Sequence, residues 1–243
     1  MRTLIPVSIR SKVYLSLLGL VSVFVFASSS AQAQTDKQIL YKAFKKMDAV
    51  QDYQAEVAMN FDIPGLNLQQ LSGKVYYKKP DKFRIKTKGI FFLPKQNLYY
   101  GMEVIADTLK YSAINSGTEK INGETCNVIT VVPNTESDLL VGKFWIQAGN
   151  GLVQKSQLTT KSNGTITVEN KFASAAANAL PDEMLLTVDV QKFKVPKMVS
   201  MEINSKAKAN ATTTKNKNTG TILLKFSQYK INQKLKDEVF EGE

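Results

Sequence analysis

The sequence predicts a mainly β protein in which a strongly curved antiparallel sheet is covered by a helical lid. The clearest indication is the alternation of apolar and polar residues from Tyr53 to Ile63, which is typical of a strand with one buried face. Further segments of strand length follow, separated by turn signals such as Pro64-Gly65 and Asn163-Gly164. Only the segment from Thr35 to Gln51 has a clear helical period, so we expect nine or ten strands and one helix.

The first 33 residues have the properties of a cleavable secretory signal. Three basic residues precede an apolar run from residue 13 to residue 27, and Ala31-Gln32-Ala33 supplies small residues for cleavage. A membrane-spanning helix needs about 20 apolar residues, so a cleaved signal is favoured over an uncleaved anchor. We expect export to the periplasm, with residues 34–243 forming a single domain. No cysteine follows the small residues, so lipidation of the chain itself is not expected.

The helix is expected to begin at Thr35. Thr35-Asp36-Lys37-Gln38 fits a capping box, in which the threonine hydroxyl accepts from a backbone amide and the glutamine side chain reaches back. Apolar residues then recur at helical spacing, at positions Ile39, Leu40, Ala43, Phe44 and Met47. Lysines lie mostly on the other side. The pattern predicts an amphipathic helix with a basic outer face that ends near Gln51.

The later strands are predicted from alternation and from the prolines and glycines that end them. They cover residues 71–77, 83–87, 126–132, 143–147, 152–159, 165–172, 184–193, 198–209 and 223–229. The apolar segment from Gly89 to Pro94 has no period and is interpreted as a buried connection or an exposed flap. Residues 95–123 are ambiguous and compatible with a short helix, and residues 210–220 predict an exposed loop.

The composition argues against several classes of chemistry. The chain has no histidine and one cysteine, so histidine-based catalysis and an intrachain disulfide are excluded. The sequence contains no recognisable catalytic constellation, metal-ligand spacing or phosphate-binding loop, so we expect no catalytic residue, no metal and no cofactor. A secreted hydrolase is kept as a distant alternative. Cys126 lies on an alternating strand and is expected to be a buried, inert thiol.

The net charge points to anionic partners. The formal charge is +11, and three of the positive charges lie before residue 34. A basic exported protein is attracted to membranes rich in acidic lipid, to acidic polymers and to acidic proteins. Nucleic acid is not expected as a partner, because the chain is exported and has no recognisable nucleic-acid module. The alternative is that the lysines form a solvated face that keeps the protein soluble.

Large apolar residues are more numerous than a flat sheet under one helix needs. They are Met59, Phe61, Tyr77, Phe83, Phe91, Phe92, Tyr100 and Trp145, of which all except Tyr100 are candidate cavity residues. A curved sheet with a helical lid can leave such a face partly unfilled, which creates an apolar cavity for a ligand. The alternative is an ordinary packed core.

Three stretches of the chain resemble the LolA-type periplasmic carriers and the wider group of outer-membrane lipoprotein-sorting proteins. The first runs from Ser72 to Arg84 and contains Lys79-Pro80-Asp81. The second joins Phe144-Trp145-Ile146 to the segment 151–155, and the third is the C-terminal stretch 226–240. Together with the signal and the first helix, the resemblance covers most of residues 35–240.

The resemblance implies an unclosed antiparallel barrel that holds acyl chains in an apolar cavity under helices. By position, Lys79 stands where such carriers usually have an arginine that helps to hold the lid, and Lys79 and Arg84 would lie at the cavity mouth. The implied function is a monomeric periplasmic carrier of acylated lipoproteins or lipids toward the outer membrane. An inner-membrane donor complex and an outer-membrane acceptor are its candidate partners. A sensor or adaptor of the same fold that binds lipidated or unfolded envelope proteins is the alternative.

Overall fold

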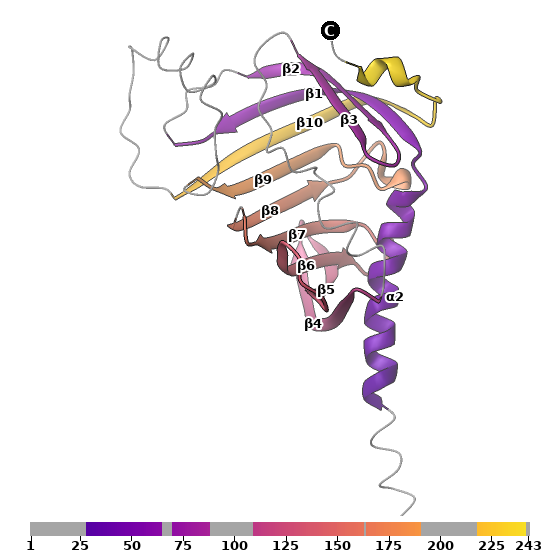
Figure 1. Ribbon diagram of the computed structural model, residues 1–243, viewed down its shortest axis with the longest axis vertical. Coiled ribbons are helices and arrows are strands. Elements are labelled where there is room, and N and C mark those ends of the chain that lie inside the picture. Colours follow the sequence, from indigo (N-terminus) through magenta and orange to yellow (C-terminus); the bar gives the residue numbers. More distant parts are fainter. Residues whose placement is uncertain (1–27, 65–69, 88–108, 163, 191–217, 242–243) are drawn as a thin grey trace, which may run out of the picture.

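A computed structural model describes residues 28–64, 70–87, 109–162, 164–190 and 218–241 of the 243-residue chain. These residues form a ten-stranded antiparallel sheet with the strand order β3-β2-β1-β10-β9-β8-β7-β6-β5-β4. Helix α2 lies against one face of the sheet, where it contacts β4 and β6 (Figure 1). The sheet is open, because β3 and β4 stand at its two ends.

The bounds of the elements follow the chain. The helix is α2 Ser28–Asp48, and the strands are β1 Asp52–Asp62, β2 Leu71–Lys78, β3 Lys82–Thr87, β4 Tyr111–Ile121, β5 Glu124–Pro133, β6 Leu139–Gln147, β7 Val153–Thr160, β8 Gly164–Lys171, β9 Glu183–Asp189 and β10 Thr219–Ile231. Two short 3-10 helices, η1 Ala176–Asn178 and η2 Asp237–Phe240, follow β8 and β10.

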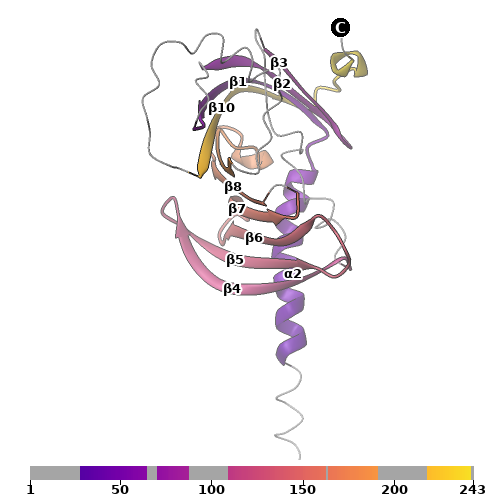
Figure 2. The ribbon, with the colours of Figure 1, turned by 60° about the vertical axis from the view of Figure 1, so that its left-hand side comes forward.

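The sheet curves around its inner face, which we define as the face that carries α2. Figure 2 shows β1, β2 and β3 at the top of a C-shaped sheet, and β4 and β5 at the bottom. Strands that are far apart in the sheet therefore face each other across the interior. The expected curved, unclosed sheet with a helical lid is confirmed.

Strand β1 shows how the alternation of the sequence produces the inner face. Tyr53, Val57 and Met59 are at most 5% exposed and belong to an apolar cluster that continues into β2, β9 and β10. Val57 pairs with Gly73 of β2 on one side and with Phe226 of β10 on the other. The intervening residues point to the outer face, because successive side chains of a strand alternate.

Helix α2 packs on the inner face through its predicted apolar side. Leu40 and Ala43 are buried against a second cluster that contains Tyr111 and Phe144. The buried carboxylate of Asp36 accepts a hydrogen bond of 3.0 Å from the backbone N–H of Asn115 in β4. The apolar side and this bond together fix the position of α2 along the sheet.

The start of α2 differs from the expectation. The helix begins at Ser28 and continues through Thr35, where the capping box predicted its first turn, and it ends at Asp48. Ala31-Gln32-Ala33-Gln34 explains the extension, because alanine and glutamine are good helix formers. These N-terminal turns extend beyond β4, the last strand of the sheet (Figure 1).

Strand β4 occupies part of the segment 95–123, whose sequence is compatible with a short helix. Only Tyr111 and Ala113 are buried on its inner face, and a register irregularity between Asn115 and Thr118 interrupts the pairing with β5. Most residues after the irregularity are exposed, so no period of two develops in the sequence. The strand therefore forms through its pairing with β5, which sequence periodicity does not report.

Several other expectations can be placed only in part. Strand β10 begins at Thr219, within the segment 210–220 for which the sequence predicts an exposed loop. The apolar segment 89–94, the candidate strand 198–209 and residue Asn163 lie outside the described residues.

Hydrogen bonds hold the segment that follows β10 against the start of β1. The buried carboxylate of Asp52 accepts hydrogen bonds of 2.8 Å and 3.0 Å from the backbone N–H groups of Gln233 and Lys234. Asn232 Oδ1 in turn accepts from the N–H of Gln51 at 2.8 Å. Lys234 has a φ of 58°, a left-handed conformation that costs a lysine energy. The bonds to Asp52 offset this cost.

Replacing Asp52 with alanine is expected to lower the free energy of unfolding by about 2 kcal/mol, because two backbone N–H groups lose a charged acceptor. Urea unfolding followed by circular dichroism measures the change. Asp62→Ala is the control, since Asp62 is exposed at the other end of the same strand. Equal effects of the two substitutions would show that the hydrogen bonds of Asp52 to Gln233 and Lys234 do not contribute to the free energy of unfolding.

Candidate binding cavity

An apolar cavity lies between α2 and the inner face of the sheet. It holds about 90 Å³ of space that the centre of a water molecule can reach. Its walls come from α2, β1, β3, β6, β7, β8, β9, β10 and two connecting segments. The lining residues are Ala43, Phe44, Met47, Tyr53, Val57, Phe83, Ile85, Phe144, Gly151, Val153, Ser156, Leu158, Val168, Asn170, Phe172, Ala179, Leu180, Pro181, Met184, Leu224, Phe226 and Tyr229.

The lining is almost entirely apolar. Apart from the two tyrosines, Ser156 and Asn170 are the only lining residues with a polar side chain. The hydroxyl of Tyr229 donates a hydrogen bond of 2.7 Å to the backbone carbonyl of Pro181, so this polar group has a partner. No charged side chain belongs to the lining. Such walls suit a hydrocarbon ligand and not a charged one.

Helix α2 forms one wall because of the spacing of its apolar residues. Leu40 and Ala43 anchor the helix, and Phe44 and Met47 continue the same side one turn further on, where they reach the cavity. The ring of Phe44 meets that of Phe144 in β6 edge to face, with centroids 5.5 Å apart. Aromatic pairs of this geometry add about 1 kcal/mol to the burial of their surface.

The connection between β8 and β9 forms another wall, and Asp182 fixes its shape. Leu180 is buried, and it lines the cavity beside Pro181. Asp182 accepts hydrogen bonds from the backbone N–H groups of Ala173 and Ser174, and the Ser174 hydroxyl also donates to it. Partial burial alone would raise the pKa of Asp182, but these hydrogen bonds outweigh it and lower the pKa below the ordinary value of 3.8.

The lowered pKa of Asp182 predicts an acid-sensitive contribution to stability. The carboxylate stabilises the folded state at any pH above its unfolded pKa of 3.8, and this stabilisation is lost as the pH falls through the lower folded pKa. Near neutral pH, the free energy of unfolding of Asp182→Asn should therefore be lower than that of the parent by the largest amount. The difference between the two proteins should shrink below pH 3.8. Urea titrations at several pH values measure this difference. A difference that does not change with pH would contradict the assignment.

The structure distributes the predicted cavity residues unevenly. Phe83 lines the cavity. Met59 is fully buried within the packed cluster of β1, and Phe61 packs against the same cluster, so both lie on the inner face away from the lining. Tyr77 stacks near Tyr53, with ring centroids 5.4 Å apart, and borders a smaller hollow beside the cavity. Phe91 and Phe92 lie outside the described residues.

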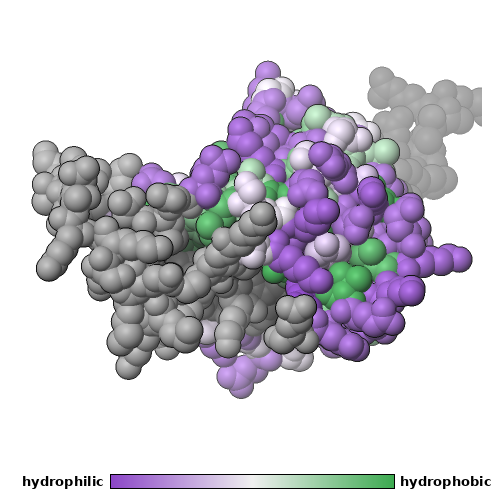
Figure 3. Space-filling view, turned by 90° about the horizontal axis from the view of Figure 1, so that it is seen from above, coloured by the Kyte–Doolittle hydropathy of each residue, from purple (hydrophilic) through white to green (hydrophobic). Residues whose placement is uncertain are grey.

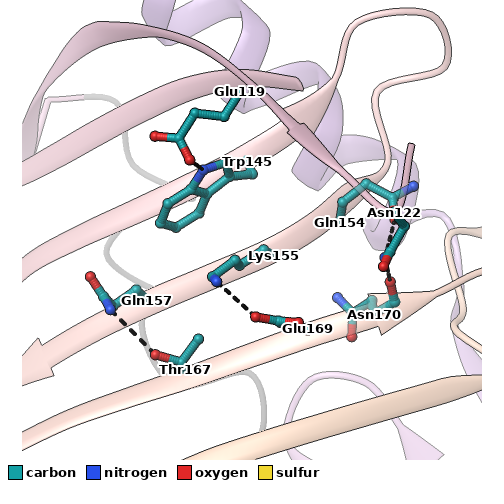
Figure 4. Close-up of polar contacts among 9 residues, drawn as sticks. All are labelled: Glu119, Asn122, Trp145, Gln154, Lys155, Gln157, Thr167, Glu169 and Asn170. Carbon is teal, nitrogen blue, oxygen red and sulfur yellow. Dashed lines mark hydrogen bonds and ion pairs between the residues drawn. The ribbon is translucent and has the colours of Figure 1, made fainter. Parts of the chain in front are cut away.

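The expectation that Trp145 lines the cavity is wrong. Its neighbours Phe144 and Ile146 point to the inner face, whereas Trp145 packs with Cys126 and Val128 in a separate cluster on the outer face. Trp145 Nε1 donates a hydrogen bond of 2.8 Å to Glu119, as Figure 4 shows. The ammonium groups of Lys143 and Lys155 lie 4.9 Å and 5.4 Å from the centroid of its ring.

The two predicted mouth residues bind different segments. Lys79 Nζ donates to the backbone carbonyl and to the carboxylate of Asp48, the last residue of α2. Arg84 donates to the backbone carbonyls of Val239 and Glu241 and so holds the C-terminal segment around η2. Lys79 therefore contacts the end of α2, whereas Arg84 contacts the C-terminal segment. The position of both residues at a cavity mouth stays a prediction.

Most of the lining was not singled out from the sequence. Met184, Val168, Leu158 and Leu224 are medium-sized residues of ordinary alternating strands. They could be identified by an even spacing from a buried residue of the same strand, which places both residues on one face. Met184 and Leu186 are an example. Residue size alone does not identify the lining, because a large ring such as that of Trp145 faces outward while smaller residues face the interior.

The described residues contain no group of three His, Cys, Asp or Glu side chains that could hold a metal ion. Cys126 is buried, as expected, and burial raises the pKa of its thiol. Within the described ranges, no helix is long and apolar enough to cross a membrane. Figure 3 shows a mainly hydrophilic surface with small hydrophobic patches on the face it displays.

Solved structures of very different sequence share this architecture. A DUF1329 family protein from Desulfovibrio piger is 12% identical, with a TM-score of 0.54 over 86% of this chain and 97% of its own. A Vibrio parahaemolyticus domain described as an outer membrane lipoprotein-sorting protein is 12% identical, with a TM-score of 0.51 over 86% and 97% of the two chains. A LolA superfamily protein from Nitrosomonas europaea is 15% identical, with a TM-score of 0.50 over 87% and 98%.

At these identities the likeness establishes the fold, which is LolA-like. No family model and no curated protein matches the sequence.

Proposed function

We propose that this protein, which has a LolA-like fold, is a periplasmic carrier that takes acyl chains of lipoproteins or related lipids into the cavity under α2. The observation that carries the proposal is the uncharged, apolar lining between a helix and a curved sheet. The solved structures of the same fold include a lipoprotein-sorting domain, which supports this class of ligand. The acyl chain would leave its membrane, cross the aqueous space inside the protein and be released toward the outer membrane.

The energetics of burial suit a carrier. Each methylene group removed from water contributes about 0.8 kcal/mol, so eight buried methylenes contribute about 6 kcal/mol. This corresponds to a dissociation constant on the order of tens of micromolar, which allows both uptake and release. The cavity has room for the beginning of a chain, and deeper insertion would displace Phe44 and Met47 of α2.

The polar contacts near the C-terminal end of α2 are weak enough to permit such displacement. There, Lys79 binds Asp48 and Lys46 Nζ donates to the carbonyl of Asn150 at 3.3 Å. The side chains of Asp48 and Lys79 are 69% and 26% exposed, and exposed ion pairs contribute about 1 kcal/mol or less. A few methylene groups of a ligand therefore provide more free energy than these contacts.

Titration with a fluorescent fatty acid tests the proposal. The purified protein without its first 33 residues should bind the probe saturably, at about one site per chain, and unlabelled dodecanoic acid should displace it. An unchanged spectrum in the presence of folded protein would contradict the carrier function.

Export is the second part of the proposal, and it predicts a specific N-terminus. Mass spectrometry of the protein from a periplasmic extract should give a chain that starts at Gln34. Cleavage there would remove the first turns of α2 and keep Asp36, whose carboxylate binds β4. A periplasmic protein with an intact Met1 would contradict cleavage.

A further inference from the structure

Asn170 is a polar side chain in the apolar cavity with one group left without a partner. Its Nδ2 donates a hydrogen bond of 2.9 Å to the backbone carbonyl of Val153. Its backbone carbonyl accepts a bond of 3.1 Å from Asn122, as drawn in Figure 4. The side-chain oxygen Oδ1 is buried and accepts no hydrogen bond. A buried hydrogen-bond acceptor without a partner lowers the stability of the fold by about 1–3 kcal/mol. Such groups are therefore rare in folded proteins and call for an explanation.

The orientation of the amide is fixed by its neighbour. Rotating the side chain by half a turn would place Oδ1 against the carbonyl oxygen of Val153, and two acceptors would then face each other. The unsatisfied atom is therefore an acceptor, and the group that would satisfy it is a hydrogen-bond donor.

The inner-face side chains adjacent to Asn170, on β8, on the segment after it and on β9, supply no such donor. Its neighbours on the inner side of the same segment are Val168 and Phe172, and its partner across to β9 is Met184. All three line the cavity and have no donor side chain. In such surroundings a single polar group discriminates strongly between ligands, because a ligand without the matching group leaves it unpaired.

We propose that Asn170 is a specificity-determining residue whose Oδ1 accepts a hydrogen bond from an N–H or O–H group beside the acyl chain of the ligand. The inference rests on the proposed function, since it assumes that acyl chains enter the cavity. It narrows the ligand class to chains that carry a donor next to the hydrocarbon, as amide-linked chains do and ester-linked chains do not.

Two amides of equal chain length separate this proposal from the carrier function itself. N-methyldecanamide has one N–H donor, and N,N-dimethyldecanamide has none. Competition against a fluorescent fatty acid measures both affinities. The parent protein should bind the first amide about tenfold more tightly, which is the effect of one hydrogen bond in an apolar site. Asn170→Leu should bind the two amides equally, and Asn170→Ala repeats the test if the leucine variant does not fold.

Asn60→Leu is the matched control, because Asn60 lies between Met59 and Phe61 on β1 and so points to the outer face. It should keep the tenfold preference. Equal binding of both amides by the parent, or the same preference in Asn170→Leu, would overturn the role of Asn170 and leave the carrier function standing. Failure of the parent to bind either amide or the fluorescent fatty acid would overturn both proposals.

Discussion

Replacing Val168 with glutamate is expected to lower the affinity for a fluorescent acyl probe at least 100-fold. Val168 lines the cavity from β8, between Ser156 of β7 and Leu186 of β9. An acyl chain that enters the variant has to displace water from a carboxylate. Removing a charge from water without a partner costs several kcal/mol, and about 2.7 kcal/mol already corresponds to 100-fold.

Thr167→Glu is the control for this experiment. Thr167 is the next residue of β8 and points to the outer face, where its hydroxyl accepts a hydrogen bond of 3.3 Å from Gln157 (Figure 4). The two variants carry the same new charge on opposite faces of one strand. The Thr167 variant should bind the probe as the parent does.

A further variant keeps the prediction testable if the buried charge prevents folding. Val168→Phe adds bulk without charge and should reduce affinity about tenfold by filling the space. Parent-like binding by folded Val168→Glu and Val168→Phe would place the acyl site elsewhere.

Replacing Trp145 with alanine is expected to lower the free energy of unfolding by about 4 kcal/mol without changing the affinity for an acyl probe. The substitution leaves a cavity in the outer cluster with Cys126 and Val128, and losses of this size are typical of buried tryptophan. The acyl site lies on the other face of the sheet, so the folded variant should keep its affinity. Urea unfolding and probe titration measure the two quantities separately.

Trp145→Phe serves as the graded control. It keeps most of the ring volume and loses the hydrogen bond to Glu119, so the expected loss is about 1 kcal/mol. A folded Trp145 variant with weakened probe binding would show that Trp145 contributes to the site after all.

The regular strands could be predicted from the sequence because only one face of each is buried. In β1 the alternation from Tyr53 to Ile63 predicts both the strand and its inner residues, which are found buried in the apolar cluster. In β6 the alternation fails. Phe144 and Ile146 are buried on the inner face, and Trp145 is buried on the outer face because it packs there in the separate cluster with Cys126 and Val128. Three consecutive apolar residues do not reveal which of them faces a ligand.

Interruptions of the strand pattern account for other differences. Gln228 has a φ of 52°, and the pairing of β1 with β10 shifts register next to it, between Gln54 and Glu56. Tyr229 thereby reaches the inner face and lines the cavity. Long-range contacts such as that of Lys79 with Asp48 also have no local signal, because they depend on how the helix crosses the sheet. The resemblance to lipoprotein carriers suggested that contact, and the geometry of the lid helix is consistent with it.

Native mass spectrometry of the protein purified from its own periplasm, without detergent, tests the carrier function most directly. A carrier should give a second species heavier than the processed chain by the mass of one lipid or acylated peptide, which is released on denaturation. Val168→Glu prepared in the same way should lack the heavier species, and Thr167→Glu should retain it. A folded parent protein that carries no additional mass and binds no acyl probe in solution would contradict the carrier function.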